Sequence, residues 1–489
     1  MLTPDLHVIS RWIRDRAAAT PNRVAIDFVG TEITYAELDE RSERLAAGFL
    51  DAGLVHGDRV ATLTGSSPGH VVVFFACAKA GLVLMPLNWR LTPPELAYQL
   101  ADAEPAVLLH DGDHAETARA LHDRSAGLED LVADSNYLGP APADEDGLLL
   151  VYTSGTTGKP KGALLTHANC FWTNLSFDLA TGISGDDVVL AVLPQFHCGG
   201  WNVQPLLAWW KGARVVLEPS FDAARVLSLI ADKGVTTMMG VPANYLFMAQ
   251  DPGFAETDLS TLRRAVVGGA PMPEALLDTW HERGVEIVQG YGLTEAAPNV
   301  LALPPEDAAR KRGFAGKPYP HVDVELRDPE TGATVEGAGE GELIVKGSNV
   351  FAGYWRSPEA TAAVLVEGCL YTGDVAERDD EGYYRIVGRT KDMVISGGEN
   401  IYPAELENVL HEHPAVAEAA VVGVPDERWG EVCLAFVALR YDATEEELLE
   451  FCRGRLARYK VPKGVVFVDA LPRNAMNKVV KADLPERVA

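Results

Sequence analysis

Residues 148–162 read LLLVYTSGTTGKPKG, and this stretch is the most informative part of the sequence. Its apolar first half predicts a buried strand, and the Ser, Thr and Gly that follow offer closely spaced amides and hydroxyls. With Lys159 and Lys161 adding positive charge, the pattern indicates a phosphate-binding loop. It is not a Walker A loop, because Thr153 stands at the first glycine position and Pro160 replaces the magnesium-binding hydroxyl. A flexible surface loop is disfavoured by so many hydroxyls and lysines in one run.

Outward from this segment, short β-branched runs alternate with helical patterns. A helix is predicted from the capping box Thr34–Glu37 to about Gly53. Strands are predicted at residues 24–28, 59–64, 83–87, 188–193, 236–241, 264–267 and 286–288. This alternation predicts an α/β fold of mostly parallel sheets covered by helices.

Two later segments break the alternation. Residues 321–346 read as short strands around a turn at 328–332, which predicts a small antiparallel element. After Arg389 an α+β pattern follows, with a helix that opens at Thr444 and is expected to end near Lys460. We therefore predict a large N-terminal domain, residues 1–390, and a small C-terminal domain, residues 391–489.

Composition excludes several classes of protein. Of the 489 residues, 47% are hydrophobic and 23% charged, which is typical of a globular chain with a large core. The 70 acidic residues outnumber the 42 basic ones, and the net charge of −28 disfavours nucleic acid as a partner. The six cysteines form no CxxC pair, and no apolar run is long enough to insert into a membrane. The expectation is a soluble cytoplasmic protein.

Further motifs follow the phosphate loop in a fixed order. They are QFHCGG at 195–200, GGA at 268–270, GYGLTE at 290–295, YTGD at 371–374, GRTKD at 388–392, SGGEN at 396–400 and PRNAMNK at 472–478. In this order, over essentially the whole chain, the motifs resemble those of the adenylate-forming superfamily, which comprises acyl-CoA synthetases, peptide-synthetase adenylation domains and luciferases. The pattern is most similar to the acyl-CoA synthetases.

The resemblance implies a two-step reaction that uses ATP, Mg²⁺ and coenzyme A. A carboxylate attacks the α-phosphate of ATP to give an acyl-adenylate and pyrophosphate, and the CoA thiol then displaces AMP. Preorganised cations and amides rather than a covalent nucleophile suit this chemistry, because two anions must meet. The small domain is expected to swing about a hinge that matches Lys391.

The resemblance also implies site residues. The ATP- and AMP-binding set is Thr153, Ser154, Gly155, Thr156, Thr157, Gly158, Lys159, Gly268, Gly269, Ala270, Gln289, Tyr291, Gly292, Thr294, Asp374 and Arg389. Within this set Thr294 would bind the α-phosphate, and Asp374 and Arg389 would hold the ribose hydroxyls. Glu295 would bind Mg²⁺, a hard cation that prefers oxygen ligands. Lys478 would bridge the attacking carboxylate and the α-phosphate.

The acyl and CoA sites are implied in the same way. The acyl pocket would be lined by His197, Gly199, Gly200, Trp201, Val241, Tyr245 and Ala296. His197 is expected to form a wall or gate rather than act as a base, because a carboxylic acid is already ionised at neutral pH. Two adjacent glycines with few cations nearby favour a bulky, largely apolar acid. CoA would contact Gly397 and Gly398, with Trp429 and Lys460 as further candidates; core packing explains Trp429 equally well.

Several alternatives stay open at this stage. Asn477 replaces the glycine that relatives carry before the lysine, so a variant that mainly performs thioesterification from acyl-AMP is one alternative. A stand-alone adenylation enzyme that loads a carrier protein is another, and a homodimer is left open. A peptide-synthetase domain would need an acid near Phe196, which is absent. Nothing in the sequence requires the oxygen chemistry of a luciferase, and a non-enzymatic binding module would require decay of the site.

Overall fold

The computed structural model describes residues 7–153, 159–270, 272–396, 399–426, 429–456, 458–473 and 479–484. Its contacts divide the chain into two compact units. The first comprises residues 1–272, 276–324 and 345–370, and the second comprises residues 273–275, 325–344 and 371–489. Position 391 lies inside the second unit, so the predicted hinge and domain boundary at Lys391 stay predictions.

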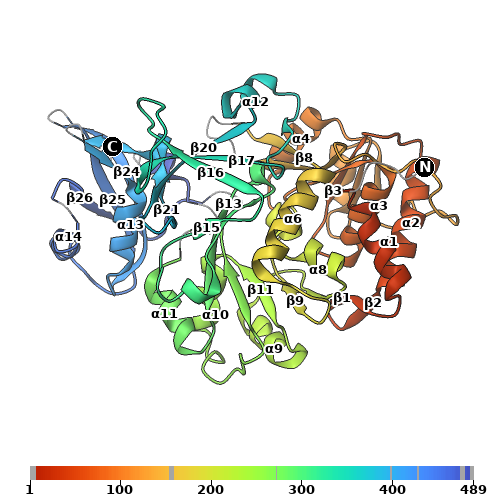
Figure 1. Ribbon diagram of the computed structural model, residues 1–489, viewed down its shortest axis with the longest axis horizontal. Coiled ribbons are helices and arrows are strands. Elements are labelled where there is room, and N and C mark those ends of the chain that lie inside the picture. Colours follow the sequence, from red (N-terminus) through yellow and green to blue (C-terminus); the bar gives the residue numbers. More distant parts are fainter. Residues whose placement is uncertain are drawn as a thin grey trace. The chain divides into compact units, whose positions relative to one another are not determined.

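One sheet of the first unit has the strand order β15-β14-β13-β12-β11-β9-β10-β1-β2 (Figure 1). Its strands are β1 (Val24–Phe28), β2 (Thr31–Thr34), β9 (Val188–Ala191), β10 (Arg214–Leu217), β11 (Thr237–Gly240), β12 (Arg264–Val267), β13 (Ile287–Gly292), β14 (Asn299–Ala302) and β15 (Lys317–Pro318). The six strands from β13 to β1 pair in parallel, whereas β2, β14 and β15 pair antiparallel at the edges. Buried parallel strands account for the continuous β-branched runs.

The second sheet of this unit has the order β18-β8-β7-β4-β3-β5-β6. Its strands are β3 (Arg59–Leu63), β4 (Val83–Pro86), β5 (Val107–His110), β6 (Ser125–Gly127), β7 (Gly147–Thr153), β8 (Lys161–Thr166) and β18 (Gly353–Tyr354). The strand predicted from the apolar run before Thr153 is β7, which pairs in parallel with β4 and antiparallel with β8. The predicted α/β class is therefore confirmed.

Helices lie between the two sheets and cover them. They are α1 (Ser10–Ala19), α2 (Tyr35–Asp51), α3 (Pro68–Ala80), α4 (Pro93–Ala103), α5 (Ala115–Leu121), α6 (His167–Thr181), α7 (Gly199–Asn202), α8 (Pro205–Lys211), α9 (Ala223–Lys233), α10 (Pro242–Gln250), α11 (Glu274–Glu282) and α12 (Pro358–Val364). Helix α3 packs on β4, α8 packs on β9 and β10, and α1 contacts both helices. Helix α3 is buried from Val71 to Ala80, which accounts for its almost wholly apolar sequence, and its one charged residue, Lys79, pairs with Asp39 and Glu43.

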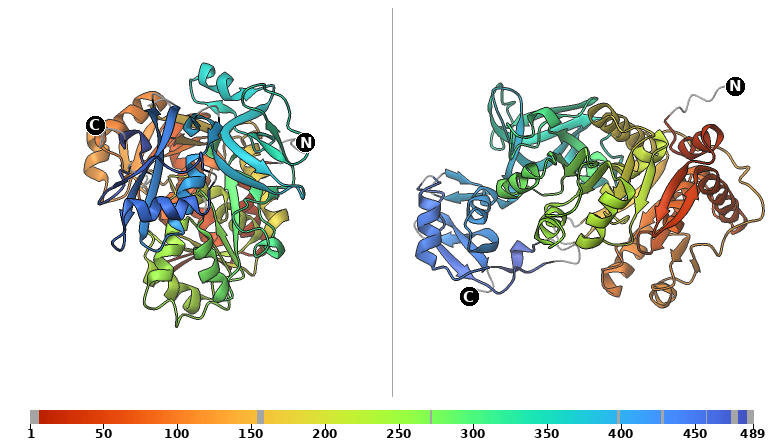
Figure 2. Two further views of the ribbon diagram at one scale, coloured as in Figure 1. Left: turned by 90° about the vertical axis from the view of Figure 1, so that its left-hand side faces the viewer. Right: turned by 90° about the horizontal axis from the view of Figure 1, so that it is seen from below.

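The second unit contains the C-terminal sheet, with strand order β23-β22-β25-β24 and β26 beside β25. Its strands are β22 (Val394–Ser396), β23 (Glu399–Ile401), β24 (Val416–Asp426), β25 (Gly430–Leu439) and β26 (Gly464–Phe467). Helices α13 (Pro403–His411) and α14 (Glu445–Arg453) pack together and against β24 and β26 (Figure 2). Their buried leucines, among them Leu406 and Leu448, form one apolar cluster with β24 and β25.

A further sheet has the order β16-β17-β20-β19, with β21 beside β20. Its strands are β16 (Val322–Arg327), β17 (Gly339–Gly347), β19 (Leu365–Val366), β20 (Cys369–Arg378) and β21 (Tyr384–Arg389). The turn predicted at 328–332 joins β16 to β17, and the Asp328 carboxylate accepts hydrogen bonds from the amides of Glu330 and Thr331. The small β element predicted for residues 321–346 thus becomes two neighbouring strands of this sheet.

One element ends earlier than predicted. Helix α14 begins after the N-cap Thr444, as expected, but it ends at Arg453 rather than near Lys460. Gly454 follows directly, and glycine has a low helix propensity.

In the part of the chain that the structure describes, no helix combines the length and apolarity needed to cross a membrane. All six cysteines are free thiols.

Candidate functional site

The predicted phosphate loop joins β7 to β8, which pair antiparallel as far as Thr153 and Lys161. Its central residues Ser154, Gly155, Thr156, Thr157 and Gly158 lie outside the described residues. The two lysines that follow rest on aromatic rings. Lys159 Nζ lies 5.4 Å from the ring centroid of Tyr98, and Lys161 Nζ lies 5.2 Å from that of Tyr354. Aromatic faces attract such cations and hold them in place.

Tyr354 also contacts the predicted magnesium ligand. Its hydroxyl donates a hydrogen bond of 2.8 Å to Oε1 of Glu295. Burial and the Glu295 carboxylate raise the pKa of Tyr354, which keeps the hydroxyl protonated as a donor. Strand β18, which carries Tyr354, pairs with β8 next to Lys161. The structure therefore places Lys161 over the ring of Tyr354 and Glu295 at the hydroxyl of the same tyrosine.

The backbone around Glu295 is fixed by several hydrogen bonds. Its carbonyl accepts from the Phe351 amide at 2.9 Å, and Asn349 Nδ2 donates to the carbonyls of Ala296 and Asn299, each at 2.9 Å. Before this turn, a Cβ on Gly292 would lie 1.9 Å from the carbonyl oxygen of Pro298. Position 292 therefore admits only glycine in this geometry, for packing reasons that are independent of any nucleotide.

Glu295 fits a magnesium ion that is shared with a nucleotide. Among the described residues, no group of three His, Cys, Asp or Glu side chains could hold a metal ion without further ligands. Mg²⁺ is commonly bound by one or two carboxylates together with substrate phosphates and water. A single carboxylate with one oxygen on Tyr354 matches that donor set. Thr294, the predicted α-phosphate contact, precedes it in the same 3₁₀ turn, Thr294–Ala296, and is half-buried.

The segment from Gln195 to Gly200 lies close to Glu295, whose charge contributes, after burial, to raising the pKa of Cys198. The neighbouring His197 is largely buried, and burial together with the positive charge of Arg90 lowers its pKa to about 4. The imidazole is therefore neutral at pH 7. This protonation state suits an uncharged wall of the site.

The two adjacent glycines of this segment differ in their surroundings. A Cβ on Gly199 would meet only the side chains of Val203 at 3.7 Å and Leu193 at 3.8 Å, which is ordinary contact. A Cβ on Gly200 would lie 2.3 Å from the carbonyl oxygen of Pro194. Gly200 is thus required by backbone packing, whereas an added Cβ at position 199 would make only ordinary contacts. That the two glycines make room for an acid stays a prediction.

Two predicted acyl-pocket residues belong to the core in this structure. Trp201 is fully buried, stacks on Phe74 with ring centroids 4.7 Å apart, and donates from Nε1 to the carbonyl of Gln195. Tyr245 is also fully buried, and its hydroxyl donates to the carbonyl of Val266 at 2.9 Å. Ala296 is fully buried, whereas Val241, the N-cap of α10, is half-buried.

The residues predicted to frame adenine follow β12 and form the end of β13. Gly268 is buried, and Gly269 has a φ of +81°, a conformation that glycine adopts without strain. Ala270, like Gly269, is exposed, and Tyr291 is half-buried. Gln289 is buried, with its amide bonded at both ends to the backbone: Oε1 accepts from Met272 and Nε2 donates to Phe314, each at 3.3 Å.

The two predicted ribose-binding residues pair with each other in the second unit. Asp374 in β20 lies directly opposite Arg389 in β21, and their Oδ1 and Nε atoms are 2.9 Å apart. Asp374 is 5% exposed, whereas the Arg389 side chain is 42% exposed. The ion pair therefore joins a buried carboxylate to an accessible guanidinium.

The predicted CoA residues are only partly described. Gly397, Gly398 and Lys478, the predicted catalytic residue, lie outside the described residues, as does Asn477. Lys391 falls in a 3₁₀ turn. Trp429 is exposed, which disfavours the alternative that it packs in a core. Lys460 Nζ lies 2.8 and 2.7 Å from the two carboxylate oxygens of Glu405. Burial lowers the pKa of Lys460, but the bond to Glu405 outweighs it and raises the pKa above its usual value.

Two residues at this site have no counterpart in the predictions from sequence. Tyr354 bonds Glu295 across 59 positions of the chain. Arg90 lies over the Phe196 ring, 5.5 Å from its centroid, and supplies the cation beside His197 that the sequence analysis did not find. Neither Tyr354 nor Arg90 belongs to one of the sequence motifs, and only the fold brings each residue close to its partner.

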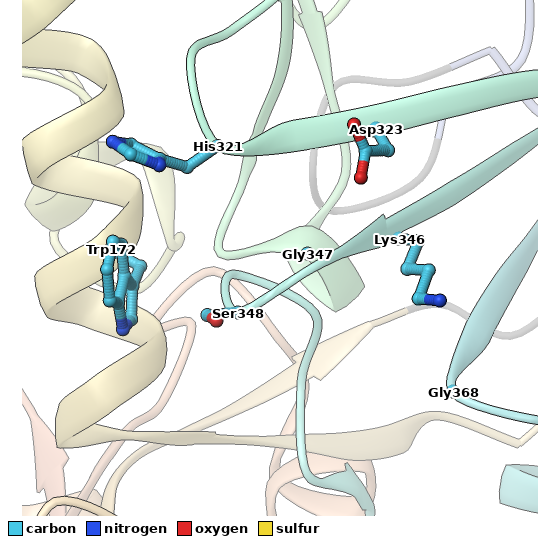
Figure 3. Close-up of a pocket in the computed structure, with 7 residues that line it drawn as sticks. All are labelled: Trp172, His321, Asp323, Lys346, Gly347, Ser348 and Gly368. Carbon is cyan, nitrogen blue, oxygen red and sulfur yellow. The ribbon is translucent and has the colours of Figure 1, made fainter.

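A surface cavity of about 410 Å³ lies elsewhere in the first unit (Figure 3). Its wall includes the rings of Trp172 and His321, with centroids 5.3 Å apart, and the charged side chains of Asp323 and Lys346. None of its lining residues belongs to the predicted sites.

Comparisons with known proteins identify the family of the chain. The family model "AMP-binding enzyme" matches residues 13–355, and the model of the C-terminal domain of AMP-binding enzymes matches residues 405–478. A feruloyl-CoA synthase of Amycolatopsis sp. is 45% identical, covering 98% of this chain and 99% of its own. An indoleacetate–CoA ligase of Aromatoleum aromaticum is 42% identical, covering 98% of both chains.

A solved structure resembles the whole chain. The o-succinylbenzoate CoA synthetase MenE of Bacillus subtilis, in complex with the acyl-adenylate OSB-AMP, superimposes with a TM-score of 0.90 at 34% identity over 97% of both chains. The two family models together cover most of the chain, and these relatives match it over nearly its whole length. The chain belongs to the AMP-binding enzyme family, the adenylate-forming enzymes, and within it to the ATP-dependent, AMP-forming acid–CoA ligases.

Proposed function

We propose that this ligase activates a bulky, largely apolar aromatic acid of about the size of a hydroxycinnamate. The observation that carries this proposal is the surroundings of Gly199, where the atoms within reach of an added Cβ belong to Val203 and Leu193. An aromatic ring gains free energy from leaving water for such surroundings. Ferulate and indoleacetate, which the relatives named above activate, are acids of this kind.

The residues present suit the first half-reaction. The acid's carboxylate attacks the α-phosphorus of ATP, the bond to the β-phosphate oxygen breaks, and pyrophosphate leaves. Lys159 and Lys161 would neutralise phosphate oxygens, and Glu295 would hold the Mg²⁺ that accompanies the nucleotide. Asp374 would accept hydrogen bonds from the ribose hydroxyls. Lys478 keeps its predicted role of bridging the two reacting groups.

In the second half-reaction the CoA sulfur attacks the acyl carbon, AMP leaves with the carboxylate oxygen, and the thiol proton is released. His197 is neutral, so it neither repels nor attracts an approaching thiolate by charge. Trp429 and Lys460 stay predictions as contacts of the CoA nucleotide.

A substrate panel tests the proposed acid. We would measure CoA-dependent release of AMP with ferulate, indoleacetate, palmitate and malonate at equal concentrations. The highest kcat/KM is expected for one of the two aromatic acids. A clear preference for palmitate or malonate would refute the aromatic substrate while leaving the ligase activity intact.

Asn477 keeps one alternative open, in which the enzyme mainly converts supplied acyl-AMP to the thioester. Isotope exchange between pyrophosphate and ATP, compared with turnover of synthetic acyl-AMP and CoA, separates the two readings. Acid-dependent exchange at a rate near that of overall turnover refutes the alternative.

Replacement of CoA by a phosphopantetheinyl carrier protein in the same assay tests the second alternative. A cytoplasmic location and a homodimer stay predictions.

A further inference from the structure

The carboxylate of Glu342 bonds the part of strand β20 that carries Asp374. Glu342 belongs to β17, which is the neighbour of β20 in the sheet. Its Oε1 accepts a hydrogen bond of 3.0 Å from the backbone amide of Gly373, the residue immediately before Asp374. A side chain of β17 therefore controls the peptide that leads into the predicted ribose-binding carboxylate.

Residues 372–374 of β20 have a defined geometry that hydrogen bonds maintain. Gly373 has a φ of +69°, in the left-handed region that favours glycine. On its other side, Thr372 Oγ1 donates to the carbonyl of Leu343 at 2.7 Å and accepts from the amide of Asp374 at 3.1 Å. This part of β20 is thus held to β17 at two successive residues, Glu342 and Leu343.

The bond to Glu342 also brings two carboxylates close together. Burial raises the pKa of Glu342, the Gly373 amide lowers it, and the negative charge of Asp374 adds to the rise, so that the net pKa lies above its usual value. Asp374 pairs with Arg389, whereas Glu342 accepts a hydrogen bond from the Gly373 amide. Like charges at close range are unfavourable, so a carboxylate here must offset that repulsion through the bond it makes.

We propose that Glu342 is a positioning residue, which aims Asp374 at the ribose hydroxyls by holding the Gly373 peptide. The proposal rests on the proposed function, because it takes Asp374 as the ribose ligand. Without the acceptor at position 342, the strand around the left-handed Gly373 loses one of its two hydrogen bonds to β17. Asp374 would then lose its fixed direction while keeping its charge and its partner Arg389.

Nucleotides that lack the ribose hydroxyls provide the test. We would measure kcat/KM for ATP and for 2′,3′-dideoxy-ATP with the full-length enzyme and a saturating acid. A ribose hydroxyl bound to a carboxylate makes a charge-assisted hydrogen bond, so the wild-type enzyme should prefer ATP by about tenfold or more. In Glu342→Ala this preference should shrink towards one, with a higher KM for ATP and an unchanged KM for the acid.

Two further variants separate positioning from general damage. Glu342→Gln retains an amide oxygen that can accept from Gly373, so its preference should stay near the wild-type value. Glu377→Ala removes another carboxylate of the same sheet, one that pairs with Arg385, and should leave the preference unchanged. In Asp374→Asn, where the preference is already reduced, adding Glu342→Ala should reduce it no further.

The proposal is overturned if Glu342→Ala keeps the wild-type preference, or if Glu342→Gln loses as much of it as Glu342→Ala. It is also overturned if the wild-type enzyme turns over ATP and the dideoxy analogue equally well, because Asp374 then does not bind the ribose. Absence of AMP release with every acid and with CoA would be a different result, which refutes the proposed function and the inference with it.

Discussion

Tyr354 is the residue through which the two charged groups of the phosphate region are connected. Its ring faces Lys161 and its hydroxyl bonds Glu295. Tyr354→Phe keeps the ring but removes the donor, and a hydrogen bond to a charged group contributes about 1.5–3 kcal/mol. We expect the variant to need about tenfold more Mg²⁺ for half-maximal adenylate formation. A Mg²⁺ titration of pyrophosphate release measures this.

The control for this variant is Tyr137→Phe. Tyr137 donates to the carbonyl of Pro140 in an exposed loop that carries none of the predicted site residues, so its variant should show the wild-type Mg²⁺ dependence. An unchanged Mg²⁺ requirement in Tyr354→Phe would mean that the tyrosine does not orient the carboxylate of Glu295.

The site residues differ in how far the sequence could predict them. Glu295 and Lys161 lie within motifs of contiguous residues, and a motif is visible without knowledge of the fold. Tyr354 and Glu342 act on groups 59 and 31 positions away, through one hydrogen bond each. Such partners are set by the pairing of β18 with β8 and by the order of the β17–β20 sheet. No local pattern encodes that pairing.

At the scale of elements, helix α7 and its two glycines give the clearest contrast. Gly200→Ala places a methyl group against the Pro194 backbone and should lower the free energy of unfolding by about 3 kcal/mol. Gly199→Ala meets only ordinary contacts and should change it by less than about 1 kcal/mol. Urea unfolding of the two variants measures the difference.

The same pair of variants probes the acyl site. Gly199→Ala should reduce kcat/KM for ferulate by about tenfold relative to a small acid such as acetate, because one methyl group then occupies space beside Val203. Equal losses for both acids would show that position 199 does not face the acyl group, and equal stability of the two variants would contradict the packing argument.

Elements were predictable where one physical signal dominates. The strands at 24–28 and 264–267 have the predicted bounds, and the capping box of α2 forms between Thr34 and Glu37 as expected. The predicted C-terminal end of α14 was wrong. Helix-forming residues continue in the sequence past Gly454, but the helix ends at Arg453, just before this glycine. The shared sheet of β16, β17, β20, β19 and β21 depends on pairing between distant segments, which periodicity does not reveal.

At the scale of the whole molecule, buried histidines make stability depend on pH. Burial lowers the pKa of His70 to about 3 and, against the opposing charges of Asp146 and Asp144, that of His167 to about 4. Burial and the positive charge of Arg90 lower the pKa of His197 to about 4. The unfolded chain therefore binds more protons below about pH 6.5, the ordinary histidine value. Stability is fully present above that pH and is lost on acidification, by about 1.4 kcal/mol per histidine for each pH unit.

His70→Gln tests this dependence away from the catalytic groups. His70 bonds the hydroxyl of Thr62 through Nε2 at 2.9 Å, and a glutamine amide can replace that bond without titrating. Acidification from about pH 6.5 to 5 should lower the unfolding midpoint of the variant less than that of the wild type. The difference in slope should correspond to one proton fewer taken up on unfolding. Parallel pH curves for the two proteins would show that His70 is protonated in the folded state.

The central claim is that a carboxylate of the acid attacks the α-phosphorus of ATP. The direct measurement is to supply ferulate labelled with ¹⁸O in its carboxylate, together with ATP, Mg²⁺ and CoA, and to analyse the products by mass spectrometry. We expect feruloyl-CoA, pyrophosphate and AMP that carries one ¹⁸O atom. Label in inorganic phosphate with formation of ADP, or thioester formed without labelled AMP, would contradict it.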